Sequence, residues 1–177
     1  QRSRVRGRRS VEGMSLLPDE LLAAGLRCGE LLKERGETVA VAEGSGGGLV
    51  SAALLAVPGA SAYYLGGSVI YTRNALDGML TGPVERPRKL RGASEPWATH
   101  LARATRVHLR ATWGIGEGGA TGPSGNPYGD PPGHAWVAVS GPTETARHVL
   151  TGDDDRLANM VAFSTAALEL LAEQLVS

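Results

Sequence analysis

Apolar positions recur at helical spacing near the start and at the end of the chain. Pro18-Asp19-Glu20 opens the first segment, with proline early and acids in the first turn, and Gly36 closes it. The apolar face between them holds Leu21, Leu22, Cys28, Leu31 and Leu32. The last segment follows three aspartates, 153–155, which favour a helix N-terminus. Its stripe holds Leu157, Met160, Val161, Ser164, Leu168, Leu171 and Leu175. Both segments are predicted to be helices.

Short apolar or alternating runs between these helices predict strands. We expect strands at 38–42, 63–72 with an interruption at Gly66-Gly67, 113–117, 134–140 and 148–151. Helices are expected at 49–57, 74–80 and 94–112, with a proline-containing loop at 83–89. Residues 118–133 form a long Gly/Pro-rich loop, of a kind that is usually functional or mobile. Because the predicted strands alternate with the predicted helices along the chain, the fold is expected to be an α/β sandwich with at least a partly parallel sheet.

Composition agrees with one α/β domain. The chain has 177 residues, of which 42% are hydrophobic, enough to bury a substantial core. Aromatic residues make up 5% and there are 25 glycines, which suits close strand–helix packing better than a β-sandwich. Cys28 is the only cysteine, so no intrachain disulfide forms, and this fits a reducing compartment. No apolar run approaches membrane-spanning length, so no membrane partner is expected.

Charge is unevenly distributed along the chain. The net charge is zero, but the first ten residues carry Arg2, Arg4, Arg6, Arg8 and Arg9 and no acid. Without these five charges the remainder carries about −5, which argues against a nucleic-acid partner. We therefore divide the chain into a disordered basic leader at 1–15 and a domain at 16–177.

The leader has two interpretations, a transit-peptide remnant or a tail left by truncation or cloning, because the chain begins with glutamine rather than methionine. The first implies a mitochondrial or plastid matrix location and the second a cytoplasmic one.

A glycine-rich turn follows the first predicted strand. Residues 42–48 read Ala-Glu-Gly-Ser-Gly-Gly-Gly and lead into a helix, so the turn is a candidate anion or oxyanion site in which Gly44, Gly46 and Gly47 contact the ligand. No Gly-Lys-Ser/Thr follows, so it is not a phosphate-binding Walker loop. The alternatives are a permissive turn and, for Ser45, a helix N-cap.

Two further segments carry candidate ligand contacts. Tyr71-Thr72-Arg73-Asn74 ends the second strand, where ligands bind in open α/β sheets, and Arg73 suits a phosphate or carboxylate. In the 118–133 loop the candidates are Gly119, Gly122 and Pro123. The alternatives are a solvated strand end and a flexible surface loop.

Several ordered motifs resemble the CinA C-terminal domain family, which includes nicotinamide mononucleotide amidases. Residues 42–48 stand where the family has Ala-Glu-Ser-Cys-Thr-Gly-Gly, and 57–67 are nearly word-for-word family sequence. Residues 71–76 stand where it has Tyr-Ser-Asn-Glu-Ala-Lys, 92–95 resemble its Gly-Ala-Val-Ser-Glu segment, and Gly152-Asp153 precede the last helix as in the family. The likeness covers residues 18 to 176. It implies a three-layer α/β/α sandwich, a homo-oligomer and a nucleotide-like small-molecule ligand.

The catalytic set of the family is only partly present. Its nucleophilic serine falls on Gly44, its activating lysine on Leu76 and its threonine on Gly118, whereas Tyr71 and Glu43 are kept. A glycine offers no nucleophile and a leucine cannot deprotonate one. The resemblance therefore implies that the serine–lysine mechanism is not available at these positions.

Rebuilt chemistry would have to use other side chains. Ser45 is adjacent to the lost serine, and Glu117 stands where the family usually has an apolar residue. Because an unpaired buried carboxylate is costly, Glu117 is expected to face solvent, a cation or a ligand. Glu43 and Glu117, at the ends of neighbouring strands, form either an acid/base pair or a metal-supporting pair, which His134 can join. The alternative is that Glu117 hydrogen-bonds the glycine-rich loops; no metal or cofactor is assigned.

Three functions follow from these observations. The first is an amidohydrolase on a nicotinamide nucleotide or related molecule, using Glu43, Ser45, Tyr71 or Glu117. The second is a catalytically inactive domain that binds a nucleotide-like ligand. The third is a structural subunit of a larger assembly with protein partners, which the transit-peptide interpretation of the leader would place in an organelle. The sequence favours a binding or structural role over classical amidase activity.

Overall fold

The computed structural model describes residues 15–177. The basic leader that the charge pattern predicts lies outside the described residues, apart from its last position. The described part begins just before the first predicted helix.

The centre of the fold is a five-stranded mixed sheet in the order β2-β1-β3-β4-β5. The strands are β1 (Val39–Glu43), β2 (Tyr64–Val69), β3 (Trp113–Ala120), β4 (His134–Ser140) and β5 (Glu144–Leu150). Strand β1 pairs in parallel with both β2 and β3, whereas β3, β4 and β5 pair antiparallel. The prediction of an α/β fold with a partly parallel sheet is therefore confirmed.

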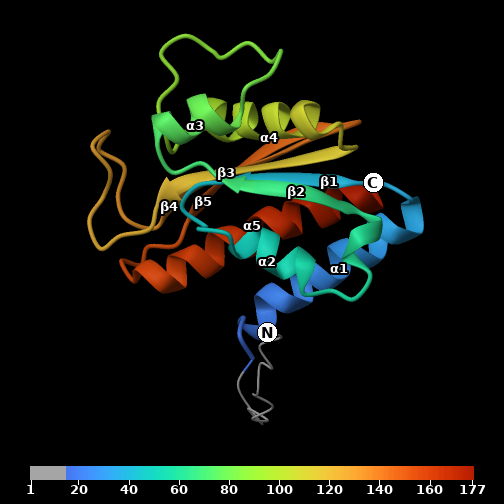
Figure 1. The fold of residues 1–177 in the computed structure, drawn as a ribbon. Helices are drawn as coiled ribbons and strands as arrows, with labels where there is room; N and C mark the ends of the chain where they lie inside the picture. Colours follow the sequence, from blue (N-terminus) through green and yellow to red (C-terminus); the bar gives the residue numbers. More distant parts are fainter. Residues whose placement is uncertain (1–14) are drawn as a thin grey trace, which may run out of the picture.

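Helices cover both faces of the sheet (Figure 1). Helices α1 (Asp19–Arg35), α2 (Leu49–Leu55) and α5 (Arg156–Val176) lie on one face, and α3 (Arg73–Met79) and α4 (Glu95–Leu109) lie on the other. A short 3-10 turn, Ala60–Ala62, precedes β2. This arrangement is the three-layer α/β/α sandwich that the family resemblance implies. Among the described residues, no helix is long and apolar enough to cross a membrane.

The main core lies between the sheet and the layer of α1, α2 and α5. Its fully buried side chains include Leu21 of α1, Val41 of β1, Ile115 of β3 and Leu168 and Leu171 of α5. A smaller cluster on the other face places Leu76 of α3 against Ile70, Trp97 and Leu101. The smaller cluster lies beneath the candidate site described below.

Strand β3 is in very close contact with α4. A Cβ atom at Gly114 or Gly116 would lie 2.0 or 1.9 Å from the carbonyl oxygen of Ala102 or Ala98. No side chain fits in that space, so the helix backbone rests directly on the strand. Glycine at alternate positions of β3 therefore brings the beginning of α4 to the edge of the site.

Several element boundaries differ from the sequence-based expectation, and β2 ends at Val69 rather than at Thr72. Strand β2 continues through Gly66-Gly67, and β3 extends over Gly118 and Gly119 to Ala120, because pairing with neighbouring strands overrides the weak strand preference of glycine. Helix α4 ends at Leu109, before the left-handed Arg110. Strand β5 begins at Glu144, four residues early, by pairing with β4. The prediction that Leu157 faces the core was wrong, since its exposed fraction is 71%.

Candidate functional site

Glu43, at the end of β1, caps the following helix α2. Its carboxylate is fully buried: Oε2 accepts hydrogen bonds from the backbone N–H groups of Gly48 (2.9 Å) and Val50 (3.1 Å). Oε1 accepts from both the backbone N–H (3.0 Å) and the hydroxyl (2.8 Å) of Ser51. A carboxylate at a helix N-terminus satisfies free N–H groups and is favoured by the helix dipole. Both oxygens of Glu43 are therefore occupied in holding the start of α2.

Glu117 lies beside Glu43, as the sequence predicts, because the two residues are register partners on β1 and β3. Its fully buried Oε2 accepts from the backbone N–H groups of Gly44 (3.0 Å) and Gly46 (2.8 Å). Its Oε1 accepts a hydrogen bond from the Ser45 hydroxyl. Glu117 therefore faces neither solvent nor an open cavity, contrary to one expectation, and instead hydrogen-bonds the glycine-rich turn, as the alternative holds.

Burial raises the pKa of Glu117 to about 7, because the charged form loses its hydration. Hydrogen bonds from Ser45 and from the amides of Gly46 and Gly44 favour the charged form and lower the pKa, while the nearby negative charge of Glu43 raises it. Desolvation is the largest of these effects. The carboxyl group thus titrates near neutral pH.

The amides of Gly44, Gly46, Gly47 and Gly48 are consequently already occupied. Glu117 takes two of them, Glu43 takes those at the start of α2, and the Gly47 N–H bonds the Gly44 carbonyl (3.1 Å). An external anion that binds the amides of Gly44, Gly46 or Gly48 would have to displace one of the two carboxylates. The interpretation of Ser45 as a helix N-cap was wrong. The N-cap of α2 is Gly48, and the Ser45 hydroxyl donates to Glu117.

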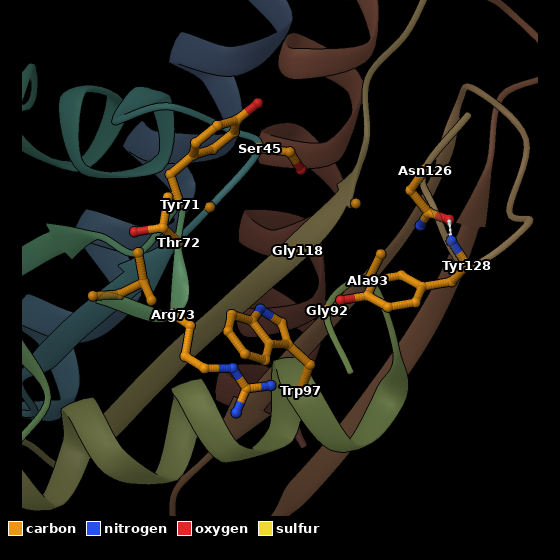
Figure 2. A pocket seen from close by; sticks show the side chains of 13 residues that line it. Ser45, Tyr71, Thr72, Arg73, Gly92, Ala93, Trp97, Gly118, Asn126 and Tyr128 are labelled. Atoms are coloured by element: carbon orange, nitrogen blue, oxygen red, sulfur yellow. Dashed lines mark hydrogen bonds between the residues drawn. The ribbon is translucent and has the colours of Figure 1, made fainter. Parts of the chain in front are cut away.

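A pocket of about 200 Å³ opens next to this turn (Figure 2). Gly44 and Ser45 contribute to it from the turn, Tyr71, Thr72 and Arg73 from the end of β2, and Gly118 and Gly119 from β3. In Figure 2, Tyr71, Thr72 and Arg73 lie on one side and Asn126 and Tyr128 on the other, with Trp97 between them. The remaining lining residues are Ile70, Gly92 and Ala93. The structure therefore brings together residues from all three segments in which the sequence predicts ligand contacts: the glycine-rich turn, the end of the second strand and the 118–133 segment.

Trp97 of α4 is the main lining residue that the sequence analysis missed. Its side chain is largely buried, and its indole lies on β3: a Cβ atom at Gly118 would be 2.7 Å from Cδ1 and 2.9 Å from Nε1. The indole Nε1–H has no hydrogen-bond partner among residues 15–177. Glycine at 118 leaves room for the ring, and the ring gives the pocket an N–H donor.

Hydrogen bonds hold the rim of the pocket. Arg73 donates to the carbonyl of Leu90 (3.0 Å), and Arg91 forms an ion pair with Asp130 (2.7 Å) while its guanidinium lies 5.2 Å from the centre of the Tyr128 ring. The Arg91 guanidinium keeps the pKa of the Asp130 carboxyl below its usual range. The rim thus orders the loop that carries Tyr128.

On the other side of the rim, Arg156 lies 3.3 Å from the Tyr71 hydroxyl and donates to the Gly122 carbonyl (2.8 Å). Tyr71 is 65% exposed. Its hydroxyl is therefore accessible to a ligand at the pocket entrance.

Some predicted site residues lie elsewhere. Gly46 and Gly47 are in the turn but do not line the pocket, and Gly122 and Pro123 follow β3 outside it. His134 does not join the two glutamates: its ring bonds the Ala93 carbonyl (2.8 Å) and the His148 ring (2.8 Å). The reason is register, because His134 pairs with Ala120, three residues beyond Glu117.

Within the described chain, no group of three or more His, Cys, Asp or Glu residues is arranged to hold a metal ion. The possibility that Glu43 and Glu117 support a metal also conflicts with their hydrogen bonds, since both oxygens of each carboxylate already accept from turn and helix donors. The two carboxylates thus hold the glycine-rich turn and the start of α2.

The fold and the turn-lined pocket define a small α/β domain of the CinA type, and comparison with known proteins identifies the family. The family model described as the CinA C-terminal domain matches residues 23–175. A CinA-like protein of Anaeromyxobacter dehalogenans (strain 2CP-1 / ATCC BAA-258) is 39% identical over 163 residues, covering 91% of this chain and 38% of that protein. One from Prochlorococcus marinus (strain MIT 9313) is 42% identical over 125 residues, covering 70% of this chain and 28% of that protein.

Among solved structures, the competence/damage inducible protein of Agrobacterium tumefaciens superposes with a TM-score of 0.83 at 28% identity, covering 93% of this chain and all of that one. A CinA superfamily protein of Klebsiella pneumoniae superposes with a TM-score of 0.80 at 24% identity, covering 88% of this chain and 98% of that one, and shows the shared fold alone. The chain belongs to the CinA C-terminal domain family. It spans about two fifths of the length of the first of these curated relatives.

Proposed function

We propose that this domain binds a small nucleotide-like molecule in the pocket beside the glycine-rich turn, without the serine–lysine amidase reaction to which the family resemblance points. The observation that carries the proposal is the chemistry at positions 44 and 76. Gly44 lines the pocket but has no side chain, and Leu76 is buried in an apolar cluster. Neither position supplies a nucleophile or a base.

The pocket keeps the features of a ligand site. Three aromatic side chains, Tyr71, Trp97 and Tyr128, offer flat surfaces, and Arg73 offers a positive charge. The Trp97 Nε1–H, which has no partner in the described part of the chain, offers a hydrogen bond to an acceptor on the ligand. Concave pockets with aromatic walls and a few polar groups are the usual sites for small molecules. A flat ring carrying a phosphate or carboxylate matches this set.

Nicotinamide mononucleotide is the appropriate first ligand to test, because the family resemblance points to it. Calorimetry should show binding, and an ammonia assay on the same sample should show no release. Arg73→Gln should weaken binding, whereas Arg103→Gln, which changes an arginine paired with Glu144 outside the pocket, should not. Ammonia release at the rate of a family amidase would refute the proposed absence of the amidase reaction, and absence of binding would refute the proposed ligand.

A further inference from the structure

Two serine–glutamate pairs flank the glycine-rich turn. The Ser51 hydroxyl donates to Glu43 Oε1 (2.8 Å), and the Ser45 hydroxyl donates to Glu117 Oε1. The pairs differ in their surroundings: Ser45 lines the pocket, whereas Ser51 lies in α2 and does not. Only the Ser45 hydroxyl is therefore placed to meet a molecule bound in the pocket.

The Glu117 carboxylate is oriented for proton transfer from Ser45. The amides of Gly44 and Gly46 fix Oε2 and leave Oε1 to the serine hydroxyl. The exposed fraction of Glu117 is 0%, and that of Ser45 is 8%. A hydroxyl hydrogen-bonded to a base that a third group holds in place is the usual arrangement of an activated nucleophile.

The environment also favours proton uptake by Glu117. Burial and the adjacent carboxylate of Glu43 both disfavour a second negative charge, which brings the pKa of Glu117 to about 7. A general base works best when its pKa is near the working pH. The titratable group that faces Glu117 within the site is Glu43, whereas the neighbouring side chain from α5 is the uncharged Ser164.

We propose that Ser45 is a nucleophile and Glu117 its general base, which gives this pocket an acyl-transfer activity on small esters that does not depend on a side chain at position 44 or 76. Ser45 Oγ forms a bond to the acyl carbon and its proton passes to Glu117 Oε1. The ester C–O bond breaks, and Glu117 returns the proton to the departing alkoxide. Water then attacks the acyl-serine, gives a proton to Glu117 and releases the carboxylic acid, and Glu117 returns that proton to Ser45.

The pocket limits the substrate class. Its volume of about 200 Å³ admits a small acyl group, and the walls formed by Tyr71 and Trp97 suit a flat or apolar one. The amides of Gly44 and Gly46 are taken by Glu117, so these two do not stabilise an oxyanion. The Trp97 Nε1–H lines the pocket together with Ser45, has no partner among the described residues and can serve as a donor for this purpose.

The test is covalent labelling of the full chain with a small alkyl fluorophosphonate, followed by peptide mass mapping. Ser45 Oγ displaces fluoride at phosphorus and Glu117 takes its proton, so the stable adduct should map to Ser45. Ser45→Ala should abolish labelling, and Ser51→Ala, the matched control, should label like the wild type. Glu117→Gln should lower the labelling rate by about 10²–10⁴-fold through loss of the base.

The wild-type protein alone can overturn the proposal. No adduct on Ser45, or a labelling rate that does not rise with pH as Glu117 deprotonates, contradicts it even if Glu117→Gln fails to fold. A folded Glu117→Gln variant that labels as fast as the wild type removes Glu117 from the reaction. The result is independent of the proposed ligand: labelling can fail while nicotinamide mononucleotide binds, and binding can fail while Ser45 is labelled.

Discussion

Replacing Glu117 by glutamine should make the protein more stable at and above neutral pH. The substitution removes a buried negative charge while keeping the size of the side chain, a carbonyl oxygen for the two turn amides and an amide group near Ser45. The pKa of Glu117 is raised from 4.5 to about 7. At 1.36 kcal/mol per pKa unit this corresponds to about 3 kcal/mol of pH-dependent stability.

The direction in which the free energy of unfolding changes with pH follows from proton binding. Between pH 4.5 and about 7 the folded protein keeps the Glu117 proton while the unfolded chain has lost it. Unfolding therefore releases a proton in this window, so the wild-type free energy of unfolding falls as pH rises through it and is constant with respect to this group above it. Glu117→Gln has no such group. The free energy difference between variant and wild type should grow by about 3 kcal/mol from pH 4 to pH 8 in favour of the variant.

Urea unfolding of both proteins across this range, followed by circular dichroism, measures the difference directly. Taking the difference between the two proteins cancels the contributions of other titrating groups to the pH dependence of stability. Among these are Glu37 and Glu144, whose pKa values are lowered mainly by hydrogen bonds from arginine partners, so that they make stability rise with pH. Glu173→Gln, at a half-exposed glutamate of α5, is the control and should run parallel to the wild type. If Glu117→Gln also runs parallel, burial does not control the ionisation of Glu117 and the reasoning is refuted.

Three further predictions concern the turn and the tryptophan. Glu43→Ala should lower the free energy of unfolding by about 2–3 kcal/mol, because the four hydrogen bonds that hold the start of α2 are lost; a smaller loss in urea unfolding would mean that water replaces them. Gly44→Ser should lower the free energy of unfolding by about 1 kcal/mol or less, whereas Gly46→Ser should lower it by about 1–3 kcal/mol. The reason is that a Cβ atom at position 46 would lie 2.8 Å from the Ser164 hydroxyl and 3.0 and 3.3 Å from the carboxylates of Glu43 and Glu117. Equal losses for the two variants would contradict this packing. Gly118→Thr should cost about 1–3 kcal/mol, and adding Trp97→Ala should remove part of that cost; strictly additive effects in a double-mutant cycle would show that the two positions do not compete for space.

Much of the fold follows from local signals in the sequence. Gly36 ends α1 in the left-handed conformation that favours glycine, and Asp155 caps α5 by accepting from the Ala158 amide (3.0 Å). The alternation in 134–140 gives β4 with its bounds correct. These elements could be predicted because residues within the segment itself set their limits.

The features that could not be predicted depend on contacts between distant segments. Read along the chain, the glycines from 118 onward indicate a loop, so the sequence predicts that the strand ends at Glu117, whereas β3 extends to Ala120. The informative pattern is the period of two in Gly114, Gly116 and Gly118, which marks the strand face that lies against α4. The place of Trp97 in the pocket also depends on a contact between distant segments. A tryptophan in a helix is expected to pack in the core, and only the structure shows that its ring lies against Gly118.

For the candidate site, the sequence correctly predicts that Glu43 and Glu117 are neighbours, but not what their carboxylates bind. Register partners on parallel strands share one face of the sheet, and here that face meets the glycine-rich turn. The two carboxylates bind different N–H groups of this segment. Glu43 accepts from the N–H groups at the start of α2, and Glu117 accepts from those of Gly44 and Gly46. Gly46 lies between them with no room for a side chain. A glycine-rich turn after a strand thus indicates that an acceptor lies against its amides, but in this chain the acceptors are its own two carboxylates. An anion can bind the amides of Gly44 and Gly46 only by displacing Glu117, and protonation of Glu117 near neutral pH weakens the hydrogen bonds that hold its carboxylate there.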